Sequence, residues 1–199
     1  MQLSELDRFF EALARHWPHP ARLLLIGGGA ALILGGERPT HDVDFEVHLT
    51  HPAKEWEAFE RAVQAARQDS GWAAQFSETI ERWSQMSWLD YQRHTKPYRT
   101  FRRIEVRVLE PAYWSLGKIG RYLNTDEQDL VAVFTKTQPD PLDVAQVWAQ
   151  SLRDSPRSTQ LALMRRQAIY FFTTYGQRIW GKEFPQGRVL AVFHPRTPR

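Results

Sequence analysis

Cysteine is absent from the sequence, which excludes disulfide bonds and thiolate metal sites. Long apolar runs are absent too: the best candidate, around residues 23–35, is broken by three consecutive glycines. It is shorter than the roughly 18 residues that cross a bilayer. The first residues, MQLSELDRFF, lack the basic start and the apolar stretch of a signal peptide. We therefore expect no membrane association and a cytoplasmic location.

The composition is that of a globular protein with a mild positive charge. Hydrophobic residues make up 42% of the 199 residues and charged residues 25%, which is typical of a soluble chain with a sizeable core. A net charge of +3 and a pI of about 9.3 permit nucleic-acid or nucleotide binding without requiring it. Much of the excess of basic residues lies late in the chain, at Arg165, Arg166, Arg178, Lys182, Arg188, Arg196 and Arg199. Two interpretations of these residues are open, solubility and an RNA-facing surface.

The first half of the chain mixes helical and strand patterns. Leu6, Phe9 and Leu13 repeat at helical spacing after a predicted cap at Ser4, and Pro18 ends that helix. A buried strand LLLIG follows, then a glycine turn, a short helix and the alternating strand HDVDFEVHL. We further predict a helix over 53–68, an ambiguous stretch over 72–92 in which MSWLDYQ fits a strand, and a strand over 101–109.

The second half is predicted to be helical. The expected helices run from Tyr113 to about Leu123, from Glu127 to Phe134 with Asp126 as cap, over 142–153 and over about 158–181. Pro139 and Pro141 mark a boundary. We therefore predict a core domain over residues 1–138 and a C-terminal helical extension over 139–199, with an irregular tail from Phe184.

The glycines Gly27, Gly28 and Gly29 stand between a predicted strand and a predicted helix. Glycine lets the backbone approach a phosphate closely, and a helix N-terminus offers unpaired N–H groups to an anion. The pattern matches neither a P-loop nor the dinucleotide fingerprint. Alone, it fits ordinary turn chemistry equally well.

Asp42 and Asp44 lie two positions apart on a predicted strand, so both carboxylates project from the same face. Their Cα atoms are expected roughly 6–7 Å apart. Carboxylate oxygens are the ligands that Mg²⁺ prefers, and two such groups with substrate phosphates can hold two metal ions about 4 Å apart. Apolar neighbours indicate a central strand, where ionised carboxylates need a cation. The alternative is the solvated face of an edge strand.

These motifs follow one another in a familiar order. The glycine turn, a short helix, the Arg38-Pro39-Thr40 turn and Asp42-Val43-Asp44 resemble the nucleotidyltransferase superfamily of the DNA-polymerase-beta type. More narrowly, they resemble its bacterial toxin–antitoxin and abortive-infection branch. In a second block, LGKIGRYLNTDEQDL, the residues Lys118, Arg121, Asp126 and Asp129 resemble that branch's helix with a phosphate-contacting lysine and its downstream aspartate. The resemblance covers about residues 22–134.

The resemblance implies both a fold and a site. The implied fold is α+β, with a nucleotidyltransferase-like mixed sheet flanked by helices and followed by the C-terminal extension. Asp42 and Asp44 are implied as metal ligands and catalytic residues for Mg²⁺ or Mn²⁺. The implied nucleotide-binding residues are Gly27, Gly28, Gly29, Arg38, Thr40, Lys118, Arg121 and Asp129.

Two positions depart from the family pattern. The second glycine is commonly followed by a serine whose hydroxyl contacts phosphate, and here that position is Gly29. The third carboxylate, a metal ligand or general base on a later strand, is assigned to Glu105, although Arg103 and Arg107 share its side. Glu46 is the fallback, because it lies on the same face as Asp42 and Asp44.

The resemblance implies a metal-dependent nucleotidyltransferase with a nucleoside triphosphate (NTP) as substrate. It moves a nucleoside monophosphate to a hydroxyl of an RNA, a protein or a small molecule. The toxin–antitoxin branch favours tRNA or a partner toxin or antitoxin as the binding partner. Two alternatives stay open at this point: a catalytically inactive binding protein or antitoxin of the same fold, and a generic α/β scaffold. The oligomeric state and the base preference are not given by the sequence.

Overall fold

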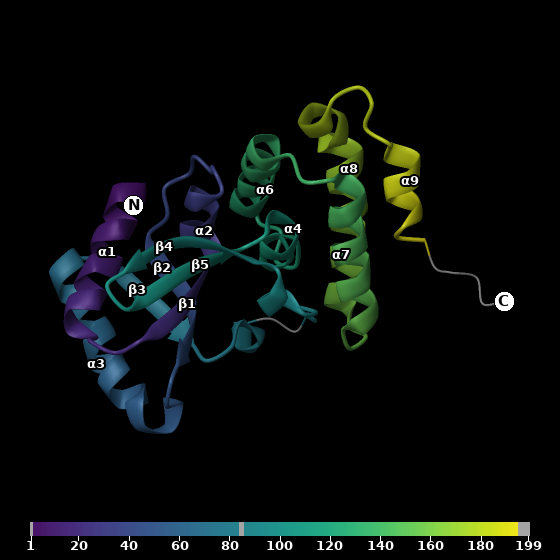
Figure 1. The fold of residues 1–199 in the computed structure, drawn as a ribbon. Helices are drawn as coiled ribbons and strands as arrows, with labels where there is room; N and C mark the ends of the chain where they lie inside the picture. Colours follow the sequence, from purple (N-terminus) through teal and green to yellow (C-terminus); the bar gives the residue numbers. More distant parts are fainter. Residues whose placement is uncertain (1, 84–85, 195–199) are drawn as a thin grey trace.

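A computed structural model describes residues 2–83 and 86–194. The fold is α+β, as predicted: a five-stranded mixed sheet is flanked by helices and followed by a helical C-terminal region (Figure 1). The strands are β1 (Ala21–Ile26), β2 (Asp42–Leu49), β3 (Ala73–Ser77), β4 (Thr95–Phe101) and β5 (Ile104–Leu109). Their order in the sheet is β3-β2-β1-β5-β4.

The helices of the first half are α1 (Leu3–His16), α2 (Gly27–Ile33) and α3 (Pro52–Ser70), with 3₁₀ turns at Ile80–Trp83 and Tyr91–Arg93. The later helices are α4 (Pro111–Trp114), α5 (Leu116–Ile119), α6 (Asn124–Thr137), α7 (Pro141–Asp154), α8 (Thr159–Trp180) and α9 (Gln186–Ala191). Among the described residues, no helix combines the length and apolar composition needed to cross a bilayer.

The apolar face of the sheet carries the core beneath the N-terminal helices. Phe45 of β2 contacts Phe9 and Phe10 of α1 and Phe59 of α3, with ring centroids 6.3–6.5 Å apart. All four rings are fully buried. The alternation predicted for β2 is confirmed, because its odd residues face this core and its acidic residues face the other way. That other face is the one on which the candidate site lies.

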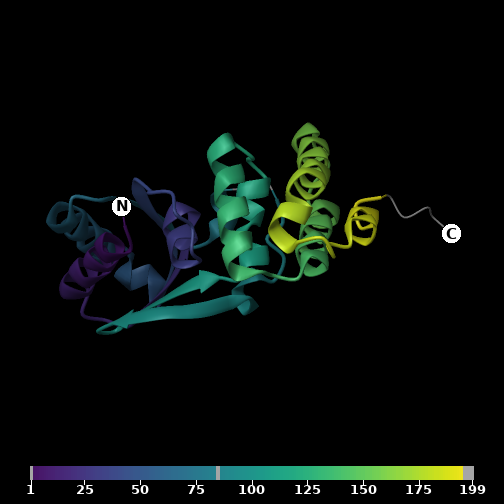
Figure 2. The same ribbon diagram turned by 90° about the horizontal axis from the view of Figure 1, so that it is seen from above.

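The C-terminal helices α7, α8 and α9 lie at the end of the molecule away from α1 and α3 (Figures 1 and 2). Trp148 of α7 is fully buried, and its indole N–H donates to Ser115 Oγ at 2.7 Å. This contact ties the extension to the core segment. The predicted domain boundary falls in the connection between α6 and α7, and the division into two domains stays a prediction.

Several local predictions were wrong. Helix α1 starts one residue before Ser4, and Glu5 Oε2 accepts the Gln2 N–H at 2.6 Å. No separate turn precedes α2, which starts at Gly27 itself. The MSWLDYQ segment, residues 86–92, forms no strand, and residues 84–85 of the ambiguous stretch over 72–92 lie outside the described part. The predicted strand over 101–109 is the turn of the β4–β5 hairpin followed by β5.

The later helices also differ from the prediction. The helix expected from Tyr113 to Leu123 is broken at Ser115, whose hydroxyl donates to the Ala112 carbonyl at 2.6 Å. Helix α6 starts three residues early, and Asp126 accepts the Leu123 N–H from within the first turn. The tail is not irregular throughout, because α9 forms after Phe184. The helices predicted over 53–68, 142–153 and 158–181 are confirmed as α3, α7 and α8.

Candidate functional site

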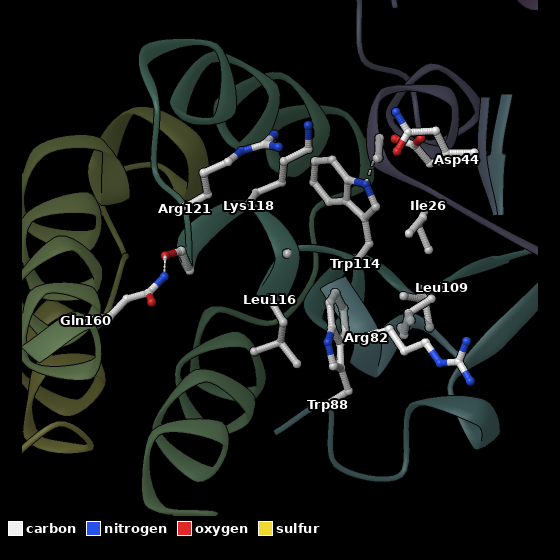
Figure 3. A pocket seen from close by; sticks show the side chains of 15 residues that line it. Ile26, Asp44, Arg82, Trp88, Leu109, Trp114, Leu116, Lys118, Arg121 and Gln160 are labelled. Carbon is white, nitrogen blue, oxygen red and sulfur yellow. Dashed lines mark hydrogen bonds between the residues drawn. The ribbon is translucent and has the colours of Figure 1, made fainter. Parts of the chain in front are cut away.

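A cavity of about 610 Å³ opens on the acidic face of the sheet, between β2 and the segment α4–α5 (Figure 3). Its walls include Asp44, Gly27, Trp114, Lys118 and Arg121. Figure 3 shows the Trp114 indole between Asp44 and the side chains of Lys118 and Arg121. The two motif blocks, which lie more than 70 residues apart in the chain, therefore meet at one site.

Asp44 is half-buried at one end of this cavity. Within the described part of the chain, no hydrogen bond or ion pair reaches its carboxylate. Burial, together with the nearby negative charge of Asp42, raises the pKa of Asp44 to about 6. The positive charges of Arg121 and Lys118 offset only part of that effect. A carboxylate in this setting is one that a bound cation would stabilise.

Asp42 lies two residues before Asp44 on β2, and the Thr40 hydroxyl contacts it. The Thr40 hydroxyl is 3.2 Å from Asp42 Oδ1 and 3.3 Å from the Asp42 carbonyl oxygen. Thr40 itself is buried against Gly28, where an added Cβ would lie 2.4 Å from Thr40 Oγ1. Only glycine therefore lets α2 approach the segment that carries the aspartates.

Glycine is also required at position 27, for a different reason. Its φ of +63° lies in the left-handed region, and an added Cβ would lie 2.7 Å from Asp44 Oδ2. Of the three glycines, the cavity wall includes Gly27. Gly29 is buried, and its missing Cβ would point at the side chain of Leu25. A side chain at position 29 would therefore begin against Leu25, and Gly29 does not line the cavity.

Lys118 lies in a buried network of charges behind the cavity. Its Nζ is 2.7 Å from Asp129 Oδ2 and 3.4 Å from Asp126 Oδ1. Arg38 donates two hydrogen bonds to Asp129, at 3.0 and 2.7 Å. Arg121 does the same to Asp126, at 2.8 and 2.6 Å. Three cations against two carboxylates leave one net positive charge next to the aspartate pair.

The network also changes the pKa of the carboxylate Asp126 within it. Burial alone would raise the pKa of Asp126, but the hydrogen bonds from Arg121 and from the Leu123 N–H hold it below its usual range. The sequence resemblance named Asp126 in its second block without giving it a binding role, and it did not include Trp114. Trp114 ends α4 and Lys118 lies in α5. Their spacing of four positions would place both on one face of the continuous helix that the sequence predicted here, and this spacing is the signal that would have found Trp114.

Trp114 links the network to the glycine segment. Its indole N–H donates to the Gly27 carbonyl oxygen at 3.1 Å. The Lys118 Nζ lies 5.7 Å from the centroid of the same ring, within the range of a cation–π interaction. Trp114 is 2% exposed. It therefore fixes the distance between the lysine and the first residue of α2.

The assignment of Glu105 to the site is corrected by the strand register. Glu105 pairs with Arg22 of β1, whereas Asp44 pairs with Ile26. Four residues of β1 separate those positions, or roughly 13 Å along the strand. Glu105 is instead ion-paired to Arg107 at 2.7 Å and to Arg22 at 3.2 Å. The hydrogen bond from Arg107, with a further one from Arg22, holds the pKa of Glu105 below its usual range.

The fallback, Glu46, is closer in sequence but is fully buried. Its Oε2 accepts from the Tyr91 hydroxyl at 2.6 Å and from the Ile80 N–H at 2.7 Å, and His48 lies 2.5 Å from Oε1. Both oxygens are thus engaged in structural contacts. Across the described residues, no group of three or more His, Cys, Asp or Glu side chains is placed to hold a metal ion. Asp44 is the carboxylate in the cavity lining, and Asp42 stands two residues before it on the same face of β2.

Comparison with protein-family models, curated proteins and solved structures finds no match to this chain. The nucleotidyltransferase resemblance therefore rests on its motif residues and stays a prediction.

Proposed function

We propose that this protein is a metal-dependent nucleotidyltransferase that moves a nucleoside monophosphate from an NTP to an acceptor hydroxyl. The observation that carries the proposal is the Asp44 carboxylate. It is half-buried in a cavity and unpaired within the described residues, and it stands beside Asp42 and opposite a cationic network. The acceptor classes are an RNA, a protein and a small molecule, and a toxin–antitoxin role in the cytoplasm is part of the same proposal.

The residues present fit a divalent cation of the magnesium class. Asp42 and Asp44 supply hard carboxylate oxygens from one face of β2. Their mutual repulsion and the burial of Asp44 make an unbound dianionic pair unfavourable, and a cation removes that cost. When bound, Mg²⁺ or Mn²⁺ supplies charge neutralisation at the phosphates and lowers the pKa of an acceptor hydroxyl. Two protein carboxylates leave further coordination positions for phosphate oxygens and water.

The chain's own cations supply the remaining charge. The network around Lys118 carries one net positive charge, and Arg121 extends from it to the cavity. Asp129 and Arg38 position the lysine, because both are bonded within the same network. Transfer forms a bond from the acceptor oxygen to the α-phosphorus and breaks the bond from that phosphorus to pyrophosphate. The protein contributes positioning and electrostatic stabilisation.

One observation favours a second function. The site lacks a third carboxylate among the described residues, because Glu105 is ion-paired elsewhere and Glu46 is engaged. A carboxylate that takes the acceptor proton is therefore not in place. The second candidate is a catalytically inactive protein of the same fold that binds nucleotide, such as an antitoxin.

A transfer assay separates the two candidates. The protein is incubated with each of the four NTPs labelled at the α-phosphate, with Mg²⁺ or Mn²⁺, and with total RNA or a cell lysate as acceptor. Asp42→Asn and Asp44→Asn are compared with wild type, and Asp143→Asn, an exposed residue of α7, is the matched control. Label transfer that both site variants lose and the control keeps supports the enzyme. Nucleotide binding without transfer to any acceptor would favour the inactive binding protein.

A further inference from the structure

Two cations, Lys118 and Arg121, line the cavity that holds Asp44, and Figure 3 shows both side chains extending toward Trp114 and Asp44. The sequence resemblance implies that the lysine contacts phosphate. The two cations differ in exposure, because the Arg121 side chain is 59% exposed and the Lys118 side chain is 4% exposed. The arginine, rather than the lysine, is therefore the cation that a ligand entering the cavity can reach.

The Lys118 ammonium is occupied by protein groups. Its Nζ lies 2.7 Å from Asp129 Oδ2 and 3.4 Å from Asp126 Oδ1. The Trp114 ring is its third neighbour, with the centroid 5.7 Å from Nζ. An ammonium has three N–H donors, and these three neighbours match that number. Contact with a phosphate would take the lysine away from two buried carboxylates, and leaving a buried charge unpaired is costly.

The Arg121 guanidinium is held along one edge and available along another. Its Nε and Nη2 donate to the two Asp126 oxygens at 2.8 and 2.6 Å, which fixes the plane of the group. Among the described residues, Nη1 of Arg121 has no hydrogen-bond partner. Because a guanidinium has five N–H donors, the edge formed by Nη1 and the second N–H of Nη2 is left for a ligand. Two parallel N–H groups match two oxygens of a phosphate.

Arg121 also acts on the carboxylate at the other end of the cavity. Its positive charge opposes the rise in the pKa of Asp44 more strongly than the charge of Lys118 does. An anion lying between Arg121 and a metal ion on Asp44 would be neutralised from both sides. A phosphate group has the charge and the number of oxygens for both contacts at once.

We propose that Arg121, and not Lys118, donates the direct hydrogen bonds to a phosphate group of the NTP. The assignment rests on the proposed function, because it takes the NTP as the ligand. Asp126 holds the guanidinium in place, and Lys118 stays within the buried network and neutralises its carboxylates. The lysine thus has a different role from the one that the resemblance implies.

The test is equilibrium titration in Mg²⁺ with two kinds of probe and no acceptor. The first kind is the set of four NTP analogues with a methylene group between the α- and β-phosphates, which cannot be transferred. The second is inorganic tripolyphosphate, which offers phosphates without a nucleoside. Arg121→Gln is expected to weaken the binding of both kinds of probe roughly 10- to 100-fold, as the loss of a charge-assisted hydrogen bond predicts.

The same network supplies matched comparators. Arg38→Gln and Lys118→Met each remove one positive charge from it, as Arg121→Gln does. Arg38 also makes a two-point contact with a buried carboxylate, Asp129, but it does not line the cavity. Both comparators are expected to lower the melting temperature at least as much as Arg121→Gln, yet to weaken the probes only about threefold, from the lost charge alone. Arg61→Gln, exposed on α3, is expected to match wild type.

Arg121→Lys keeps the charge and a partner for Asp126 but loses the two-point geometry. It is expected to bind both probes roughly three- to tenfold more weakly than wild type, and it decides the question if Arg121→Gln does not fold. All titrations are run at a temperature at which thermal unfolding shows each variant to be folded. Three results would overturn the assignment: Arg121 variants that bind like wild type, a larger loss of affinity in Lys118→Met than in Arg121→Gln, or a loss confined to the NTP analogues.

Failure of the assignment and failure of the proposed function give different results. If both probes bind through Arg121 but wild type transfers no label to any acceptor, the enzymatic proposal falls and the assignment stands. If label is transferred in a reaction that needs Asp44, while Arg121→Gln keeps the affinity of wild type, the assignment falls alone.

Discussion

The substitution Asp44→Asn is expected to stabilise the metal-free protein while it removes activity. The folded-state pKa of Asp44, about 6, lies above its ordinary value of 3.8. The ionised form is therefore less favourable in the folded than in the unfolded state. This cost is absent below about pH 4, grows as the pH rises through about 6, and is complete above that. Asparagine has nearly the same shape and carries no charge, so the variant avoids the cost.

The magnitude follows from the pKa. A shift of about two units corresponds to roughly 3 kcal/mol as an upper bound. Asp44 is only half-buried, and screening by solvent reduces this to roughly 1–2 kcal/mol. For a chain of this length, that equals a rise in melting temperature of about 2–8 °C.

The assay is thermal unfolding in the presence of a chelator at about pH 7.5 and about pH 4, with Asp143→Asn as control. The gain is expected at the higher pH and absent at the lower one. Added Mg²⁺ or Mn²⁺ is expected to raise the melting temperature of wild type more than that of the variant. A variant no more stable than wild type at about pH 7.5, or a gain of equal size at both pH values, would refute the electrostatic account of the site.

Three further substitutions test the geometry. Gly28→Ala places a Cβ 2.4 Å from Thr40 Oγ1 and is expected to cost about 1–3 kcal/mol in urea unfolding. Asp129→Asn leaves Lys118 with a weaker partner in a buried network, and the expected loss is about 3 kcal/mol by the same method. Trp114→Phe keeps an aromatic side chain but is smaller and loses the indole hydrogen bond to α2. We expect a loss of about 1 kcal/mol from the hydrogen bond, with a further loss from packing, and weaker NTP binding in equilibrium titration.

The aspartate pair and the face it lies on could be predicted, because strand alternation has a period of two and is strong in HDVDFEVHL. The position of Glu105 could not. Its alternation placed it on the correct face, but the register between β1 and β5 sets it opposite Arg22 rather than near Ile26. Register depends on tertiary packing that one strand's sequence does not contain.

Strand β4 was missed for a related reason. It is polar, contains Pro97 and lies at the edge of the sheet, where proline and charge are tolerated. The Arg38–Asp129 pair joins residues 91 positions apart. No local pattern predicts such a contact, although the motif resemblance had placed both residues at one site.

The central claim is that the α-phosphoryl group, with its nucleoside, is the group transferred. The most direct measurement compares ATP and the other NTPs labelled at the α-phosphate with the same NTPs labelled at the γ-phosphate, in parallel reactions with Mg²⁺ or Mn²⁺. The account predicts that the α-label enters the acceptor, that the γ-label appears in pyrophosphate, and that both depend on Asp42 and Asp44. Entry of the γ-label into the acceptor, or α-label transfer that survives in both aspartate variants, would contradict it.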